Sequence, residues 1–92
     1  MEKVLNKLTL SEQGSICGTL ELIEVTTGDT VEYDVTYSMN IPDPSFSKIN
    51  KRYNVARIKT EKSAQKFYKK QVKKLIEEGV LNYFYDLIDR TT

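Results

Sequence analysis

The side chains that most often carry catalysis are scarce in this sequence. It contains no histidine, the commonest general base and metal ligand, so its one cysteine, Cys17, has no imidazole to activate it. Glu77 with Glu78, or Asp86 with Asp89, could pair as acid and base, but both sets fall at polar positions without an apolar pocket around them. The four glycines are scattered, so no phosphate-cradling loop is present. We therefore expect a protein that is not an enzyme and that uses no cofactor and no metal.

Basic side chains, in contrast, are concentrated in one segment. Residues 48–74 contain eleven lysines and arginines against one acid, Glu61, whereas residues 1–47 contain two against eight acids and residues 75–92 one against four. The net charge of +1 conceals this segregation, which matters because salt screens a charge beyond about 8 to 10 Å and the potential is therefore local. The candidate binding residues in the basic segment are Lys51, Arg52, Arg57, Lys59, Lys62, Lys66, Lys69, Lys70, Lys73 and Lys74.

A basic surface of this kind suits a polyanionic partner. Lysine and arginine neutralise phosphates and release counterions, and the same side chains complement the acidic surface of a protein. A solvated helix face is the simpler interpretation, because lysine is a strong helix former. Six helix lysines without an interleaved acid repel one another, however, which a surface without a binding role usually avoids. We expect a non-enzymatic binding module that uses a basic strand-plus-helix surface to bind nucleic acid or an acidic protein surface.

A protein–protein interaction module is the alternative function. The small size and the lack of catalytic motifs would suit an inhibitor or adaptor of the sort that phages encode. Such a protein would dock through its six tyrosines or through an apolar stripe near the C-terminus, with charge serving only to steer the encounter. The acidic side chains of Glu21, Glu32 and Asp34 could form a metal site or a basic-protein site, but more often such residues line the exposed side of a sheet.

The length and composition indicate one small soluble domain. Ninety-two residues bury only about 60 to 65% of the chain surface, so the core must be economical. No apolar run approaches the roughly 20 residues that cross a bilayer, and the first ten residues do not resemble a secretory signal. A lone cysteine cannot form an intrachain disulfide, which fits a reducing compartment. We expect a cytoplasmic protein with a single α+β domain over residues 1–92 and no membrane partner.

The clearest structural pattern is a pair of strands within residues 16–39. Between Val31 and Met39 every second residue is apolar, which predicts a strand with one polar face. In the strand before it, Leu20 and Leu22 would lie on one face of a regular strand and Ile23 on the other, so we expect a β-bulge at Leu22 and Ile23. A three-residue loop at residues 27–29 should connect the two strands. The expected pairs are Val25 with Val31, Ile23 with Tyr33, Leu22 with Val35 and Leu20 with Tyr37.

Two further segments favour strands. Residues 4–10 are ambiguous between a helix turn and a first strand, and the turn-like residues after them favour the strand. Residues 40–50 contain both prolines and are expected to form a loop, and residues 51–60 read as a strand rich in β-branched and aromatic side chains. The sheet should therefore be an antiparallel meander of three or four strands.

A helix should follow this sheet. Thr60 is a suitable N-cap, and the next residue, Glu61, favours the positive end of a helix dipole. At 100° per residue an apolar stripe lies within about 120° of arc, and the helix lysines lie on average about 150° away from it. We expect the stripe to pack on the sheet and the lysines to face solvent. The stripe consists of Ala64, Tyr68, Val72, Leu75 and Ile76.

The helix should break at Gly79. The apolar residues that follow centre about 160° from the first stripe, so one straight helix would point two apolar faces in opposite directions. A glycine in the left-handed conformation would end the first helix and let a second, over residues 80–89, fold back as a C-terminal helix pair on one face of the sheet. The alternative is that the second stripe is a homodimer face. Its residues would be Val80, Phe84, Leu87 and Ile88.

The start of the first helix partly resembles the double-stranded RNA-binding domain, an α-β-β-β-α fold whose last helix begins with phosphate-contacting lysines. Lys62 and Ala64 match the start of that helix. Gln65 stands where the family has a lysine, and Phe67 and Tyr68 occupy the positions of two small alanines. With only two matching residues, the sequence does not assign the chain to that family.

Overall fold

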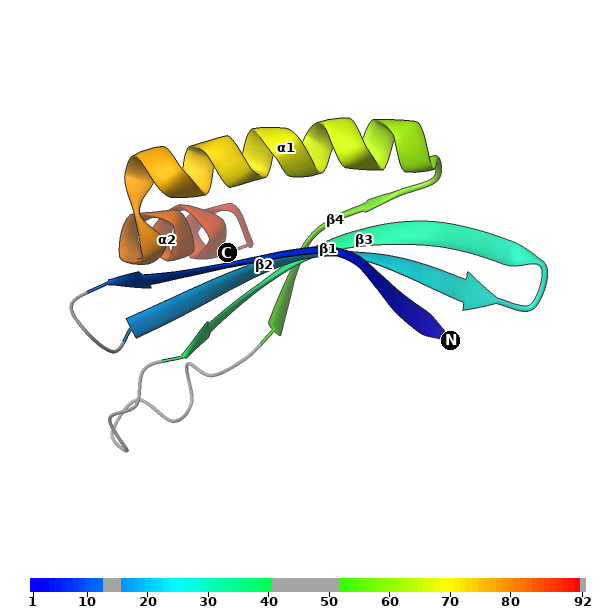
Figure 1. Cartoon of the computed structure of the whole chain (residues 1–92), viewed down its shortest axis with the longest axis horizontal. Helices are drawn as coiled ribbons and strands as arrows, with labels where there is room; N and C mark the ends of the chain where they lie inside the picture. Colours follow the sequence, from blue (N-terminus) through cyan, green and yellow to red (C-terminus); the bar gives the residue numbers. More distant parts are fainter. Residues whose placement is uncertain (13–15, 41–51, 92) are drawn as a thin grey trace.

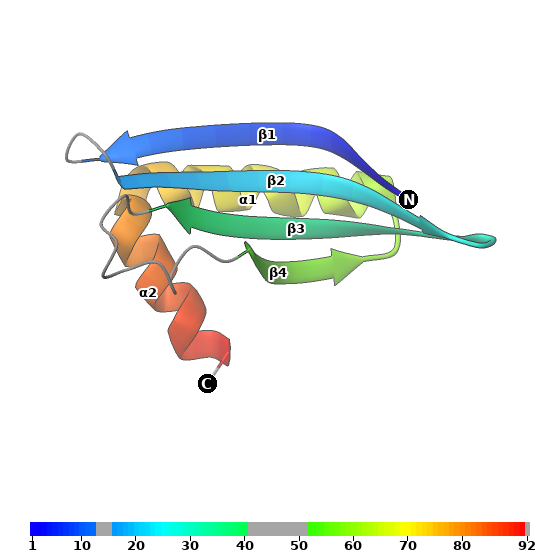
Figure 2. The same cartoon turned by 90° about the horizontal axis from the view of Figure 1, so that it is seen from below.

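In the described part of the chain, four strands form one sheet, and two helices cover one face of it. The computed structural model describes residues 1–12, 16–40 and 52–91 of the chain. Each strand pairs antiparallel with the next, in the order β1-β2-β3-β4, and both helices lie on the same side of the sheet (Figures 1 and 2). The expected α+β meander with a C-terminal helix pair on one face is confirmed. The elements are β1 (Glu2–Glu12), β2 (Ile16–Thr27), β3 (Thr30–Asn40), β4 (Arg52–Ile58), α1 (Glu61–Glu78) and α2 (Val80–Thr91).

The ambiguous N-terminal segment is a strand. Residues 4–10 lie within β1, where Leu8 pairs with Leu20 and Leu10 with Gly18. The strand expected over residues 51–60 corresponds to β4. Of the loop expected over residues 40–50, Asn40 ends β3 and the rest lies outside the described residues. With a strand at the N-terminus, the described chain does not have the α-β-β-β-α order of the double-stranded RNA-binding domain.

The β2–β3 hairpin turns over two residues, 28 and 29, instead of the three expected. Gly28 adopts a φ of +59°, which glycine reaches without a steric penalty. The ladder from this turn has no register shift, so the β-bulge expected in β2 at Leu22 and Ile23 is wrong. The pairs Leu22 with Val35 and Leu20 with Tyr37 are confirmed, whereas Val25 faces Glu32 and Ile23 faces Asp34.

The middle of β2 needs no bulge because both of its faces are buried. Leu22 is buried on the helix side, and Ile23 is 1% exposed on the opposite side of the sheet, which we call the open face. The register shifts occur in the two outer strands instead, between Val4 and Asn6 in β1 and at Val55 in β4. A bulge bends a strand and increases its twist, so these shifts curve the sheet at its edges.

The core lies between the sheet and the helices. It contains Leu20, Leu22, Val35, Tyr37 and Met39 from the sheet and Ala64, Tyr68 and Leu75 from α1. The expected stripe of α1 is partly wrong, since Val72 is half-buried and Ile76 is 60% exposed, while Gln71 is buried in their place. The side-chain oxygen of Gln71 accepts a 2.7 Å hydrogen bond from the Tyr83 hydroxyl of α2. The buried face of α1 is therefore rotated toward α2 relative to the sequence prediction.

The ends of α1 follow the residues that predict them. The Thr60 hydroxyl accepts a hydrogen bond of 3.4 Å from the Ser63 amide, which confirms the N-cap. The break at Gly79 is also confirmed, and the Gly79 amide donates to the Leu75 carbonyl at 2.8 Å. Gly79 has a φ of +90° and a ψ of 166° rather than the left-handed helical values expected. Such angles are open almost only to glycine.

The second helix folds back and buries its apolar face within the same chain. Val80, Phe84 and Leu87 belong to the core, and the Phe84 ring packs edge-on against Tyr53 of β4 with 5.6 Å between the ring centroids. These three side chains are buried in the monomer and cannot form the homodimer face considered as an alternative, and Ile88 is half-buried.

The first residue of α2 is held by two side chains of the sheet. The Val80 amide donates to Glu12 Oε1 at 2.6 Å, and the Val80 carbonyl accepts from the Tyr37 hydroxyl at 3.1 Å. Burial raises the pKa of the Tyr37 hydroxyl, so this group remains a donor even at alkaline pH. A Cβ atom at Gly18 would lie 2.9 Å from Tyr37 Cζ and 3.0 Å from Val80 Cγ1. The absence of a side chain at Gly18 thus leaves the space that the Tyr37 ring occupies beneath α2.

Replacement of Gly18 by alanine should therefore destabilise the protein. We expect Gly18→Ala to lower the free energy of unfolding by about 1 to 3 kcal/mol, because the added methyl group overpacks a buried contact. Urea unfolding at neutral pH measures the change. Gly28→Asn is the control, since no atom lies within 4 Å of that site and asparagine tolerates a positive φ. A Gly18→Ala variant as stable as the wild type would contradict the close packing of Tyr37 on Gly18.

Loss of the Glu12 carboxylate should loosen the start of α2. We expect Glu12→Ala to cost about 0.5 to 2 kcal/mol, as other lost N-terminal caps do, whereas Glu12→Gln keeps an acceptor and loses only the attraction of the charge to the helix dipole, about 0.3 to 1 kcal/mol. Hydrogen exchange of the amides at residues 80–83 reports this directly. Unchanged exchange in Glu12→Ala would show that the carboxylate does not hold α2.

Candidate functional site

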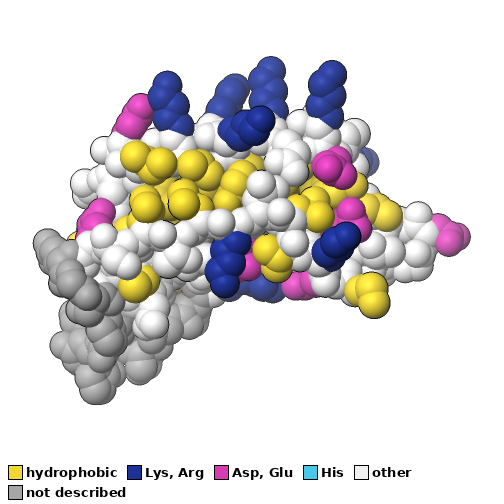
Figure 3. All heavy atoms as spheres, in the orientation of Figure 1, with side chains coloured by type: hydrophobic (Ala, Val, Ile, Leu, Met, Phe, Trp, Pro, Cys, Tyr) yellow, Lys and Arg dark blue, Asp and Glu magenta, His cyan; other side chains and the backbone are white. Residues whose placement is uncertain are grey.

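Five exposed lysines form a row along the outer side of α1. They are Lys62, Lys66, Lys69, Lys70 and Lys73, and we call them the lysine ridge. Figure 3 shows basic side chains projecting from the top of the molecule, where α1 lies, away from the sheet. The rise of an α-helix is about 1.5 Å per residue, so the ridge spans about 16 Å from Lys62 to Lys73.

The ridge carries charge of a single sign. Within the described part of the chain, no ion pair joins a ridge ammonium group to a carboxylate. The sixth lysine of α1, Lys74, is half-buried, and its Nζ lies 3.8 Å from Glu78 Oε2. Exposed acids occur only toward the two ends of α1, at Glu61 and Glu77. The middle of the helix is therefore an uncompensated cationic surface.

The arginines of β4 lie on the other side of the molecule, on the open face of the sheet. Arg57 pairs with Asp34 in the β3–β4 ladder, and its Nε and Nη2 donate to the two carboxylate oxygens of Asp34 at 2.7 and 2.9 Å. Arg57 Nε also lies 3.8 Å from Glu32 Oε2. The hydrogen bonds from Arg57 hold the pKa of the Asp34 carboxyl below its ordinary value, against the opposing effect of burial. Two acids of the β2–β3 hairpin thus neutralise Arg57.

Arg52 is also engaged in an ion pair. Its Nη2 lies 3.4 Å from Glu2 Oε1, and this contact joins β4 to β1, the two outer strands of the sheet. Because β2 and β3 lie between them, the pair must cross the open face, where Ile23 is buried. The contact ties the two edges of the sheet together.

The structure therefore separates the residues that the sequence grouped. The lysine ridge stands alone on α1, while Arg52 and Arg57 neutralise acids on the opposite side of the sheet. Lys59 is exposed in the short connection from β4 to α1, and Lys51 lies outside the described residues. Sequence reasoning missed this separation because alternate residues of a strand face opposite sides, and the register that places Arg57 opposite Asp34 was not predicted.

Glu21, Glu32, Asp34 and Cys17 form no metal-binding cluster among the described residues. Glu32 and Asp34 contact Arg57, and the residues that the structure describes contain no group of three cysteine or carboxylate side chains able to hold a metal ion. Cys17 is half-buried in β2, with its Sγ 3.4 Å from the Ser11 hydroxyl of β1.

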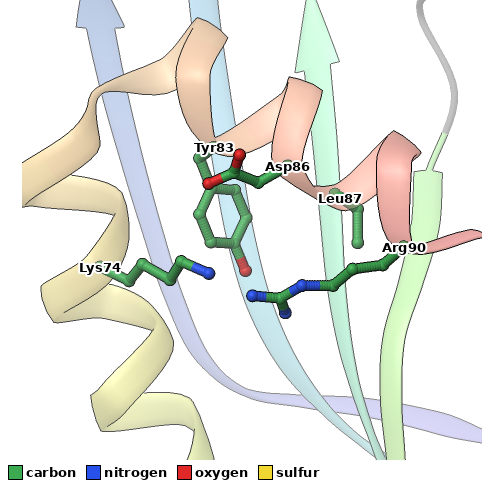
Figure 4. A pocket seen from close by; sticks show the side chains of 5 residues that line it. All are labelled: Lys74, Tyr83, Asp86, Leu87 and Arg90. Carbon is green, nitrogen blue, oxygen red and sulfur yellow. The ribbon is translucent and has the colours of Figure 1, made fainter.

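A shallow hollow between α1 and α2 brings several ionisable side chains together. It is lined by Lys74, Tyr83, Asp86, Leu87 and Arg90. Figure 4 shows the charged ends of the Lys74 and Arg90 side chains extending toward the Tyr83 side chain. Burial raises the pKa of Tyr83 to about 12, although the positive charge of Arg90 opposes this shift. The hollow is too shallow to enclose a substrate.

Two carboxyl groups meet beside this hollow. A hydrogen bond with Asp86 raises the pKa of Glu78, and burial adds to the shift, while Lys74 and Arg90 oppose it. The acid pairs considered from the sequence were neighbours along the chain, Glu77 with Glu78 and Asp86 with Asp89, whereas the pair in the structure, Glu78 with Asp86, joins two helices. The available signal was the break at Gly79, since a fold-back at that position brings residues of the two helices together.

The tyrosines do not form an exposed docking surface. Tyr37, Tyr68 and Tyr83 are buried, and their hydroxyls donate to Val80, Leu20 and Gln71 respectively. Of the six tyrosines, only Tyr85 is largely exposed, at 58%.

Comparison with protein-family models, with curated proteins and with solved structures finds no match to this chain. No helix of the described residues has the length and apolar character needed to cross a membrane. The surface chemistry of the described residues is therefore the basis for a functional proposal.

The contact between Asp34 and Arg57 predicts a pH dependence of stability. Because the pKa of Asp34 is lowered by folding, its contribution to stability is present above the ordinary aspartate pKa of about 3.9 and is lost as the pH falls through the lower folded value. We expect Asp34→Asn to remove this part of the acid destabilisation, measured as the difference in unfolding midpoint between neutral and acidic pH. Glu32→Gln is the control, because its 3.8 Å contact with Arg57 is longer and its effect should be smaller. Identical acid profiles for Asp34→Asn and the wild type would contradict the assignment.

Proposed function

We propose that this protein is a non-catalytic binding module whose lysine ridge engages an acidic macromolecular surface, with an acidic protein as the favoured partner. The ridge is exposed on one helix that is anchored to the sheet by a buried apolar face. Its cations are presented by a rigid element, so little conformational freedom is lost at the backbone when a partner binds.

The contrast between the ridge and β4 carries this proposal. Arg52 and Arg57 are neutralised by carboxylates of the same chain, as Lys74 is, whereas the five ridge ammonium groups have no carboxylate partner among the described residues. Like charges three and four residues apart on a helix repel one another. An anionic partner removes that repulsion, so its binding gains attraction and relieves a cost of the free protein.

The side chains beside the ridge favour an acidic protein over nucleic acid as the partner. Ile76 is 60% exposed and Val72 is half-buried on one flank of α1, which offers apolar area to a protein partner. No exposed aromatic side chain that could stack on unpaired bases lies among the ridge lysines, because Tyr68 is buried and Phe67 packs against the core.

Duplex nucleic acid is the second candidate. The ridge spans about 16 Å, which corresponds to roughly five base-pair steps at about 3.4 Å each, and an uninterrupted series of lysines suits phosphate contacts without base recognition. This candidate rests on the length and single sign of the ridge.

The proposal is tested by comparing polyanion binding of the wild type with that of a variant that carries fewer ridge charges. We expect the wild type to bind poly-glutamate or duplex DNA at low salt, with a slope of log affinity against log salt of about −4.5 for duplex DNA if five phosphates are contacted. The double variant Lys66→Gln/Lys73→Gln should reduce the magnitude of that slope by about 2. Fluorescence anisotropy over a series of salt concentrations measures both quantities.

A matched control distinguishes the effect of the ridge lysines on binding from the effect of the net charge of the protein. Thr27→Glu/Thr30→Glu lowers the net charge by the same amount at the exposed tip of the β2–β3 hairpin and should retain the wild-type slope. Equal losses in both double variants, or a wild type that binds neither polyanion at low salt, would overturn the proposed function.

A further inference from the structure

The outer strand β1 offers a free backbone edge. It is the first strand of the sheet order, and within the described part of the chain no other strand pairs with its outer side. The bulge between Val4 and Asn6 distorts the first half of β1, as protective bulges do at sheet edges. Residues 6–12 beyond it pair with β2 in an unbroken register. This second half is a regular edge to which another strand can add.

The direction of the backbone groups on this edge follows from β2. Thr26 exchanges backbone hydrogen bonds of 2.9 Å with Met1 in both directions, so its N–H and C=O point toward β1. Along β2, which has no bulge opposite β3, the backbone N–H and C=O groups of successive residues point alternately toward β1 and toward β3. Those of Thr19, seven residues before Thr26, therefore point away from β1. Thr9, opposite Thr19, therefore directs its own N–H and C=O to the free edge. The 3.0 Å approach of the Thr9 and Thr19 hydroxyls fits such a pair.

An apolar groove lies beside this edge, between β1 and α1. At one end Gln65 of α1 donates a 3.0 Å hydrogen bond to Asn6 of β1. At the other end Glu12 of β1 accepts from Val80, the first residue of α2, which directly follows the C-cap Gly79 of α1. The distance along β1 from residue 6 to residue 12 is about 20 Å, and that along α1 from residue 65 to residue 79 is about 21 Å. The strand and the helix therefore run side by side in the same direction.

The groove is formed by four apolar side chains, Leu8, Leu10, Val72 and Ile76, which we call the edge groove. Leu8 and Leu10 are half-buried on the helix-facing side of β1. Val72 and Ile76 follow Gln65 by seven and eleven residues and so share its flank of α1, the flank that faces β1. Figure 3 shows a band of exposed apolar side chains beneath the row of basic ones.

Cations lie on both sides of the place where a strand would add. Lys69 follows Gln65 by one helical turn, and Lys73 follows Lys69 by another, so both border the edge groove from above. Lys7 lies on the open face of β1, opposite Glu21. An added strand would place alternate side chains against the groove and the others beside Lys7, and its acidic side chains would meet these ammonium groups.

We propose that the free edge of β1 at residues 6–12, together with the edge groove and Lys69 and Lys73, binds an extended acidic segment of a partner protein as a fifth strand of the sheet. Main-chain hydrogen bonds join the segment to β1, alternate apolar side chains of the segment contact Val72 and Ile76, and its acidic side chains pair with the lysines. The proposal deepens the proposed function, since it uses two lysines of the ridge and assigns the partner to the protein class.

A second copy of the chain is a poorer occupant of the same edge. Two copies joined antiparallel through β1 would continue one sheet and place their α1 helices on the same face. The bordering lysines of one copy would then face those of the other across the joined grooves, which like-charge repulsion disfavours. The charge of the site thus favours an acidic segment over self-association.

Selection from a phage-displayed library of random peptides, followed by chemical modification of the selected peptide, tests the proposal. We expect selected sequences with apolar residues at every second position and acidic residues among them. We expect N-methylation at one set of alternate residues of the peptide, those whose N–H groups face β1, to reduce its affinity at least tenfold, and N-methylation of the other set to leave the affinity unchanged. Isothermal titration calorimetry measures each affinity without any change to the protein.

Protein variants complete the test. Thr9→Pro removes an edge donor without breaking the pairing of β1 with β2 and should abolish peptide binding, with circular dichroism as the check on folding. Its binding of poly-glutamate should remain as in the wild type, because the lysines are untouched, whereas Lys66→Gln/Lys73→Gln should weaken poly-glutamate binding. The failure of the strand addition is thereby distinguishable from the failure of the proposed function.

Three results would overturn the proposal. The first is a selected peptide that tolerates N-methylation of both sets of alternate residues. The second is binding of duplex DNA by the ridge with no peptide enriched by the selection. The third is a concentration-dependent dimer of the wild type that Thr9→Pro dissociates, which would make a second copy the occupant of the edge.

Discussion

The start of α2 is held from two directions, and much of the structure depends on this point. The Val80 amide is bound by Glu12 of β1 and the Val80 carbonyl by Tyr37 of β3, so the sheet satisfies both backbone groups of the first helical residue. Gly79 makes the turn possible, and Gly18 leaves room for the Tyr37 ring. With α2 anchored in this way, Gln71 of α1 faces Tyr83, and α1 is rotated so that Ile76 points outward. The position of α2 therefore decides which flank of α1 is exposed beside β1.

The charges of the chain are divided by the two faces of the sheet. On the open face, Arg57 and Arg52 meet Asp34, Glu32 and Glu2, so residues from blocks of opposite sign along the sequence neutralise one another. On the outer side of α1, the ridge lysines form no ion pair with any carboxylate of the described residues. The paired arginines on the open face connect strands of the same chain, whereas the unpaired lysines of the ridge are available to a partner. This division converts a basic segment of 27 residues into a smaller and sharper cationic surface on one helix.

The ridge and the edge groove adjoin each other, which gives the two proposals a common physical basis. Lysines supply long-range attraction that salt weakens, while a free strand edge and apolar side chains supply short-range contacts that hold a docked segment. The hollow between the helices lacks this combination, because its cations already meet the carboxyl pair of Glu78 and Asp86. In the part of the chain that the structure describes, the side formed by α1 and β1 combines unpaired charge, apolar area and free backbone groups.

Local signals in the sequence determined most of the secondary structure. Alternation predicted β3, Thr60 predicted the start of α1, and Gly79 predicted its end, because each is a property of neighbouring residues. The antiparallel meander and the outward orientation of five of the six helix lysines followed from the same periodicities, whereas Lys74 is half-buried. The tertiary structure decided what depends on contacts between distant residues. Examples are the register that sets Asp34 against Arg57, the burial of Gln71 in place of Ile76, and the meeting of Glu78 with Asp86. Strand register and helix rotation are set by packing against partners far along the chain, so periodicity shows that a face is buried without showing which residue lies opposite.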